Sequence, residues 1–430
     1  MYTLDNKEDL TDEKLIKFIN KHRQEMAKKK ELMDMYKGDY EIKYQAEKDK
    51  FKPDNRLIAN FAKHVVDTFG GFFMGVPVKI THENKEVEEE LEFISKYNVQ
   101  DDIDAELSKL CSVYGRAYEL LFIDEAARVG TTFVSPAECF LIKDTSIRER
   151  SLYGVRYFRN EAREVEGTIS DDREIRYFKI KDGKVVIDYV KPHYFGGVPL
   201  IEYVENTEQQ GAFENVVSLI NAYNKAISEK ANDVDYYADA YLMILGAELD
   251  ENALGILRDK RIINLEGYDT DKLIVDFLSK PSSDETQENL INRLEKLIFQ
   301  ITMVANINDE SFGNTSGISL RYKLQSMNNL AAAKERKFTA AMNEKYKLIS
   351  NLPNTKMGTN DWLKIKYQFT RNVPSNLLEE TEIATKLTGI TSDATALSVL
   401  SVVDNVESEK EKKATEEVDK MKVFLNDEVN

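Results

Sequence analysis

The sequence has only two cysteines, Cys111 and Cys139, with no Cys-x-x-Cys spacing and no histidine beside either one. This shortage excludes a disulfide framework and a zinc site, and we expect both thiols to be buried like small apolar side chains. No run of 18 apolar residues occurs, so no membrane-spanning helix is predicted. The amino terminus lacks a basic segment followed by an apolar one, which predicts no secretion signal and assembly in the cytoplasm.

The sequence also lacks a phosphate-binding loop and a nucleophile elbow. Gly70 and Gly75 have the glycine spacing of such a loop, but Val76 and Pro77 stand where lysine and serine or threonine are required. The glycines of 313–317 are one residue out of register for a nucleophile elbow. We therefore predict no cofactor. Because the sequence has no nucleotide-binding motif, energy for moving any ligand would have to come from a partner protein.

One metal-dependent alternative follows from two acidic sites. Asp54 and the Glu-x-Lys of Glu83 and Lys85 imitate a metal-dependent nuclease, whose chemistry needs both carboxylates on neighbouring strands around a divalent cation. The sequence between them has a helical period, so we expect the carboxylates not to meet. The nuclease is the less favoured alternative, and no catalytic or metal-binding residue is predicted.

Basic residues are in deficit, and their distribution is uneven. The net charge is -17, which argues against tight nucleic-acid binding, because that affinity depends mainly on lysine and arginine contacts to phosphates. Residues 205–310 contain 21 acidic against 9 basic residues, whereas 317–350 contain 2 against 7. The first segment would repel DNA and the second could contact it. Solvated helix faces would explain each charged residue taken singly, but they do not explain why acidic and basic residues are separated into two segments.

Two helical patterns separated by a polar loop dominate the second half of the chain. Residues 283–304 have apolar side chains at helical spacing, and Ser282 with Glu285 forms a capping-box signature. The polar loop covers 305–316. Helical spacing resumes over 317–350 without a proline, which predicts a helix of about 50 Å. The residues predicted to form an apolar seam between helices are Leu290, Leu294, Ile298 and Ile301.

The first half of the chain predicts a mixture of helices and strands. Amphipathic helices are expected over Thr11–Tyr36 and Asn55–Phe69, followed by a glycine turn at Gly70 and Gly71. Asp182-Gly183 is a strong hairpin signal. Further segments are a helix at 102–113 and strands at 117–124, 131–133, 138–143, 152–158, 164–169, 174–180 and 185–190. The fold class is therefore α+β.

Several blocks resemble one known family in the same order along the chain. The run SFGNTSGISLRYKL at 311–324, followed by KERKF at 334–338, resembles the loop and long helix of tailed-bacteriophage portal proteins, of the type found in siphoviruses of Gram-positive hosts. YGRAYE at 114–119 and SPAECF at 135–140 resemble that family as well. The resemblance covers most of the chain.

The resemblance implies a portal-type fold divided into named parts. It comprises an α/β wing, a two-helix stem, a small α/β clip, a tunnel loop, a long helix joining wing and crown, and an α-helical crown. The implied boundaries are 1–210 for the wing with a return strand at 361–374, 211–240 and 283–304 for the stem, 241–282 for the clip, 305–316 for the loop, 317–350 for the long helix and 375–430 for the crown.

The same resemblance implies a function. The chain would be a non-enzymatic subunit of a homo-oligomeric ring, a dodecamer, at the capsid vertex of the virion, through which double-stranded DNA is packaged and ejected without sequence specificity. Its partners would be terminase, the head-completion or adaptor protein, and the scaffolding and major capsid proteins. The main alternative is a helical scaffold or adaptor protein of a phage particle that never encloses DNA.

Site residues follow from the implied parts. The loop in the tunnel would present Asn308, Asp309, Glu310, Ser311, Phe312, Gly313 and Asn314. The clip would contact partners through Asp250, Glu251, Arg258 and Lys260. An acidic wall formed by the stem would give phosphates no strong resting site, and salt would confine the repulsion to about 8 Å. Subunit number is not encoded, because ring closure depends on interface angles.

Overall fold

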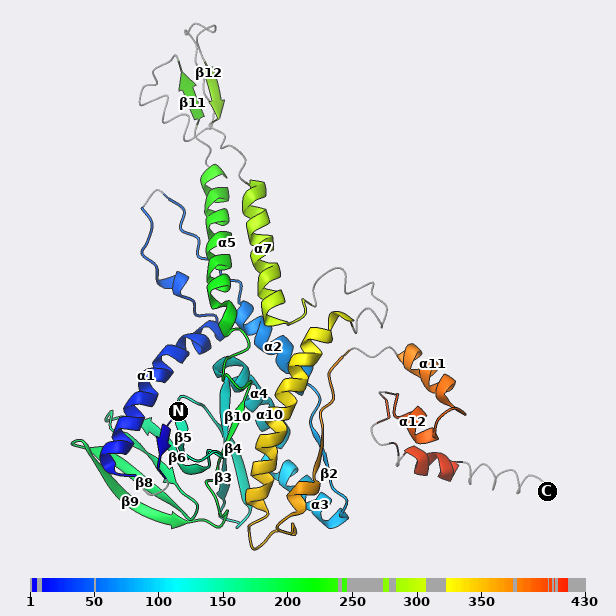
Figure 1. Cartoon of the computed structure of the whole chain (residues 1–430). Helices are drawn as coiled ribbons and strands as arrows, with labels where there is room; N and C mark the ends of the chain where they lie inside the picture. Colours follow the sequence, from blue (N-terminus) through cyan, green and yellow to red (C-terminus); the bar gives the residue numbers. More distant parts are fainter. Residues whose placement is uncertain are drawn as a thin grey trace, which may run out of the picture.

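The computed structural model describes residues 2–5, 10–49, 52–238, 242–245, 274–277, 284–306, 322–373, 377–400, 402–403, 406 and 409–416. Its body combines two sheets with covering helices, and one helix pair projects from it with a two-stranded ribbon at the far end (Figure 1). The mixed helix and strand content confirms the predicted α+β class. No helix in the described ranges is long and apolar enough to cross a membrane.

The larger sheet contains five of the predicted strands and one strand that was not predicted. Its strands are β1 (Tyr2–Leu4), β5 (Cys139–Asp144), β6 (Ser151–Arg159), β7 (Val165–Ser170), β8 (Glu174–Lys181) and β9 (Lys184–Pro192), in the order β1-β5-β6-β7-β8-β9. The hairpin between β8 and β9 turns at Asp182-Gly183 as expected. The unexpected strand is β1, which pairs parallel with β5.

Helix α1 (Asp12–Tyr36) covers one face of this sheet. Its first turn is capped by Thr11, whose hydroxyl accepts from the backbone N–H of Lys14 at 3.4 Å. The predicted apolar stripe is buried, and Leu15 and Ile19 pack against sheet residues such as Phe140. Burying such a stripe against a sheet face is what stabilises an amphipathic helix in a domain.

The smaller sheet lies at the centre of the main hydrophobic core. It contains β10 (Leu200–Val204), β3 (Arg116–Ile123) and β4 (Val129–Val134) in that order. The helices that pack around it are α2 (Phe61–Met74), α3 (Lys85–Asn98), α4 (Gln100–Tyr114) and α10 (Gln325–Ile349). Gly115 ends α4 at φ +83°, and a Cβ there would lie 2.0 Å from the carbonyl oxygen of Gln209, so only glycine fits.

The second predicted helix is displaced. Helix α2 begins at Phe61, capped by Asn60, and continues through Gly70 and Gly71, where a turn was predicted. Residues 52–60 are instead extended and run alongside α5 (Figure 1). The predicted return strand is β13 (Lys366–Gln368), which pairs with β2 (Lys79–Thr81) after the short helix η3 (Asp361–Lys364).

The projecting helix pair consists of α5 (Val217–Ala238) and α7 (Asp284–Thr302). A short turn, η2 (Glu214–Val216), precedes α5, and the ribbon at the far end is β11 (Leu242–Leu245) paired with β12 (Ile274–Phe277). Helix α10 has 25 residues, which corresponds to about 37 Å, and it lies within the predicted helix 317–350. Residues 317–321, where that predicted helix starts, lie outside the described residues. The remaining short elements are η1 (Glu41–Tyr44), α11 (Leu377–Leu387) and α12 (Asp393–Leu397).

Candidate functional site

Lys345 anchors the carboxyl-terminal half of α10 inside the body. Its ammonium donates to Oε1 of Glu119 at 2.6 Å, and both side chains are almost fully buried. The hydroxyl of Tyr203 donates to the other oxygen of Glu119 at 2.8 Å. Gln100 donates to Glu119 at 3.0 Å and to Asp104 at 2.8 Å. One network therefore joins α4, β3, β10 and α10.

Asp104 is the second carboxyl of this network. Burial raises its pKa to about 7, while Lys345 opposes this shift and Glu119 adds to it. One lysine thus faces two acidic groups in a dry site, and a neutral Asp104 leaves a single buried ion pair. Removing either partner of such a buried ion pair should destabilise the fold strongly, because the remaining charge would be buried without compensation.

Lys334 anchors the same helix about three turns earlier. Its ammonium lies 2.7 Å from Oε2 of Glu205 and donates to the hydroxyl of Ser112 at 2.9 Å. It also lies between 5.1 and 5.5 Å from the ring centroids of Phe69, Phe73 and Phe338. The lysine is 1% exposed, so this charge is internal to the chain.

The two anchors change the interpretation of the charge pattern. Lys334 and Lys345 belong to the basic segment 317–350, yet neither can contact DNA, because both are buried and paired. Glu205 belongs to the acidic segment and is neutralised by Lys334. Part of the charge segregation therefore serves pairing within the chain. The expectation that the basic segment could contact DNA is wrong for these two lysines.

The helix pair α5–α7 is joined by polar and apolar contacts. Lys230 forms an ion pair with Glu288, and Gln287 donates to Asp233 at 2.8 Å. Partner numbers rise on one helix as they fall on the other, so the helices are antiparallel. On α7 the buried apolar residues are Ile291, Leu294, Ile298 and Val304 just beyond the helix end.

The four predicted seam residues divide into two pairs. Leu294 is 8% exposed and Ile298 is fully buried, whereas Leu290 is 53% and Ile301 46% exposed. Within one chain, therefore, Leu290 and Ile301 do not lie in an apolar seam. The periodicity placed all four on one broad face, but the chain itself covers only the side of that face that points to α5 and α2.

An extended segment, which we call the strap (residues 52–60), is held along α5 by a ladder of hydrogen bonds. The side chains of Asn232, Ser228 and Asn224 accept from the backbone N–H groups of residues 55, 57 and 59, at 2.6, 2.9 and 2.8 Å. Four residues of helix rise about 6 Å, and two residues of extended chain rise about 6.6 Å, so the two spacings match. No sequence pattern predicted this contact.

Comparison with known proteins decides the family. The family described as phage portal protein, SPP1 Gp6-like, matches residues 15–423, nearly the whole chain. The chain belongs to this portal family. The portal protein of Clostridium phage phiCD119 is 25% identical over 386 residues, covering 82% of this chain and 83% of that relative. The portal protein of Bacillus phage SPP1 is 25% identical over 211 residues, covering 44% of this chain and 41% of that relative.

Two solved structures superpose at low sequence identity. One is described as the neck of an empty GTA particle computed with C6 symmetry, with a TM-score of 0.48, 10% identity, and coverage of 78% of this chain and 88% of that chain. The other, the neck of a native GTA particle computed with C12 symmetry, has a TM-score of 0.48, 12% identity, and coverage of 79% and 89%. The family assignment rests on the sequence matches.

The family makes this chain a phage portal subunit, a structural component of the virion head rather than an enzyme. The two acidic sites of the nuclease alternative pair with different cations. Asp54 on the strap pairs with Arg56 at 2.7 Å, and Glu83 lies 3.9 Å from Lys364. In the part of the portal protein that the structure describes, no group of three or more potential ligands could hold a metal ion.

Two groups of predicted site residues cannot be placed. Tunnel-loop residues 308–314 and the clip residues Asp250, Glu251, Arg258 and Lys260 lie outside the described residues of the portal protein. Helices α5 and α7 together contain seven acidic and four basic residues, so they hold an excess of three. Residues 239–283 contain nine acidic against five basic residues, a further excess of four.

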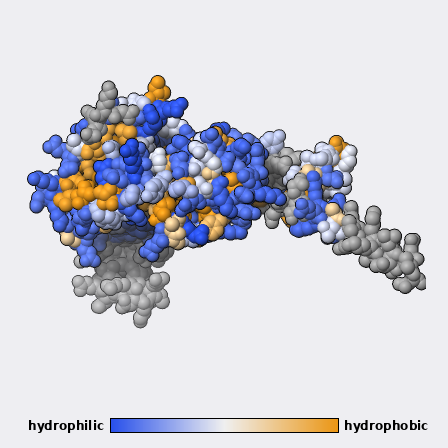
Figure 2. Space-filling view, turned by 90° about the horizontal axis from the view of Figure 1, so that it is seen from below, coloured by the Kyte–Doolittle hydropathy of each residue, from blue (hydrophilic) through white to orange (hydrophobic). Residues whose placement is uncertain are grey.

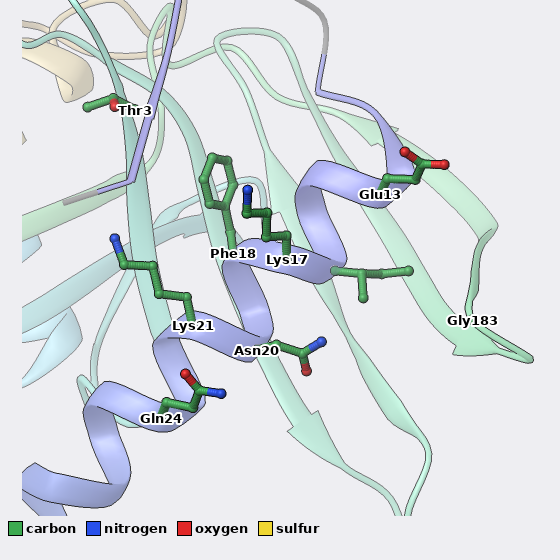
Figure 3. A pocket seen from close by; sticks show the side chains of 9 residues that line it. Thr3, Glu13, Lys17, Phe18, Asn20, Lys21, Gln24 and Gly183 are labelled. Carbon is green, nitrogen blue, oxygen red and sulfur yellow. The ribbon is translucent and has the colours of Figure 1, made fainter.

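Other surface features of the portal protein lie on its body. A pocket of about 850 Å³ separates the first turns of α1 from the β8–β9 hairpin, and Lys17, Lys21 and Glu13 line it (Figure 3). Apolar side chains gather at the end of the body that holds the larger sheet (Figure 2). Edge strand β9 exposes Val186, Ile187, Tyr189 and Val190. Cys111 and Cys139 are both buried, as predicted.

Proposed function

We propose that this portal subunit closes into a homo-oligomeric ring of twelve copies and that double-stranded DNA passes through its centre during packaging and ejection. The observation that carries the proposal is the projecting helix pair, which is only partly covered by its own chain and exposes Leu290 and Ile301. Repeated around an axis, such a pair forms the wall of a channel. A surface that is complementary to another part of the same molecule generates a ring when its rotation closes.

The parts of the chain are assigned accordingly. The body over 1–210, with the return strand in 361–374, is the wing, α5 and α7 are the stem, and 241–282 is the clip. Residues 305–316 are the tunnel loop, 317–350 contain the long helix, and 375–430 form the crown. The two buried lysine anchors support this division, because they fix α10 rigidly against the wing sheet.

DNA would pass the channel without a strong binding site. The acidic excess on α5, α7 and 239–283 disfavours phosphate contacts, and no basic excess occurs on the helix pair. The loop residues Asp309 and Glu310 would face the DNA. Lys334 and Lys345 take no part, because they are buried. Movement of the DNA is driven by a partner.

Docking partners would meet the tip of the helix pair. We assign Asp250, Glu251, Arg258 and Lys260 to contacts with terminase during packaging and with the head-completion protein afterwards. The scaffolding and major capsid proteins would contact the body, and assembly would take place in the host cytoplasm before the ring becomes part of the virion.

Electron microscopy of the purified protein tests the proposal. We expect rings with a central hole and twelve-fold symmetry. A rod or a compact particle would instead favour the helical scaffold or adaptor. Replacing Asp309 and Glu310 by lysine adds four charge units per subunit and should slow packaging in a salt-dependent manner, while rings still form. If the variant packages DNA at the normal rate in low salt, Asp309 and Glu310 do not face the DNA.

A further inference from the structure

The exposed apolar residues of α7 form one continuous stripe. Leu290 and Ile301 are 53% and 46% exposed, and Leu297 between them is half-buried. At about 100° per residue, the three positions fall within roughly 40° of one another around the helix. Solvent-facing positions of a helix usually carry polar side chains, so this stripe needs a cover that the described residues of its own chain do not supply.

Helix α5 has a second stripe of the same kind. Val234 is 61% exposed, and Ile227, about 20° away around the helix, is half-buried. The other sides of α5 are occupied or polar. Lys230 and Asp233 face α7. The strap covers the side that bears Asn224, Ser228 and Asn232, and Lys225 lies at the edge of that side, about 20° from Asn232 around the helix.

The two stripes lie on opposite sides of the helix pair. Counted from amino to carboxyl end, the α5 stripe lies about 80° after the positions that face α7, and the α7 stripe lies about 110° before the positions that face α5. Because the helices are antiparallel, both offsets turn in the same direction when viewed from one end. The facing positions of the two helices point toward each other, in opposite directions. Turning from them in the same sense therefore brings the two stripes to opposite sides of the helix pair.

We infer that the α7 stripe of one copy packs against the α5 stripe of the next copy. The occupant is a second copy of this chain, because one element offers two apolar stripes on opposite sides, which is what a head-to-tail contact requires. A two-fold contact would need only one patch that matches itself. This inference rests on the proposed ring and specifies which helix faces join its subunits.

The buried native cysteines allow a direct test by crosslinking. Cys111 and Cys139 are both 0% exposed, so a short bis-maleimide should leave the wild-type protein unlinked. We would introduce Leu290→Cys together with Val234→Cys in the full chain. The expected product is a ladder of covalent oligomers that extends beyond the dimer on a denaturing gel. Either single variant alone should give no ladder beyond the dimer.

A matched control separates this contact from a general proximity of subunits. Leu290→Cys with Lys225→Cys places the second thiol on the other side of α5 and should give no ladder. If the first pair impairs assembly, Leu290→Cys with Ile227→Cys tests the same stripe two helical turns away. Rings without a ladder from either stripe pair, or a ladder from the control as well, would overturn the inference while leaving the ring intact. Absence of rings in the wild-type protein would instead contradict the proposed function.

Discussion

Helix α10 and the helix pair α5–α7 use their side chains in opposite ways. Helix α10 places two lysines inside the body, where Glu119 and Glu205 neutralise them. The helix pair leaves Leu290, Ile301 and Val234 exposed to solvent. The first arrangement is complete within one chain, whereas we propose that another copy completes the second. We therefore expect mutations in α10 to affect folding, and mutations on the exposed stripes to affect assembly.

The largest effect should come from Lys345→Met. The variant leaves Glu119 buried without its cation, which should cost about 3–5 kcal/mol of folding free energy. Thermal unfolding monitored by circular dichroism at a fixed protein concentration would measure the loss. Lys347→Met, two residues away and 46% exposed at its side chain, is the matched control and should change stability by less than about 0.5 kcal/mol. Equal melting temperatures for the two variants would contradict the anchor.

Asp104→Asn tests the protonation of the same network. The folded-state pKa of Asp104 is raised from 3.8 to about 7, so the folded chain retains a proton that the unfolded chain releases in this interval. The contribution of Asp104 to stability therefore falls as pH rises from 3.8 to about 7. Asparagine resembles the neutral acid, so the variant should lose less stability than wild type between about pH 5 and pH 8, by on the order of 2 kcal/mol. Parallel pH curves would show that Asp104 does not titrate there.

A smaller effect is expected from Asn232→Ala on the helix pair. It removes one rung of the strap ladder and leaves the backbone N–H of Asn55 without its acceptor, at a cost of about 1 kcal/mol. Hydrogen exchange at residues 55–59 would measure it, with faster exchange confined to the strap. Lys225→Ala, on the same side of α5 but outside the three hydrogen bonds that hold the strap, should leave that exchange unchanged. A slower or unaltered exchange rate of the backbone N–H of residue 55 in Asn232→Ala would show that Asn232 does not hold the strap.

The sequence predicted the elements whose signals are local. The turn at Asp182-Gly183 and the two strands beside it depend on a few neighbouring residues, and both the turn and the strands occur in the structure. The strap could not be predicted, because its backbone N–H groups bond to side chains more than 160 residues later in the chain. Strand β1 has three residues, too few for a period.

The candidate site shows a similar division. Helical periodicity identified the apolar positions of α7, but a period cannot tell which neighbour covers each position, so Leu290 and Ile301 were grouped with Leu294 and Ile298. Lysine spacing likewise gave no indication that Lys334 and Lys345 are buried, since their partners Glu205 and Glu119 are distant in sequence. Charge counts alone therefore overestimated the basic surface of the long helix.

The oligomeric states of Leu290→Asp and Leu294→Asp test most directly whether the exposed stripe of α7 serves assembly while its buried residues serve folding. Light scattering during size-exclusion chromatography would measure the mass of each variant. Leu290 is exposed in the single chain, so we predict a folded Leu290→Asp subunit that fails to form rings. Leu294 is 8% exposed, and aspartate there should destabilise the chain itself by several kcal/mol. Intact rings of Leu290→Asp would contradict the account, because the stripe would then not join subunits.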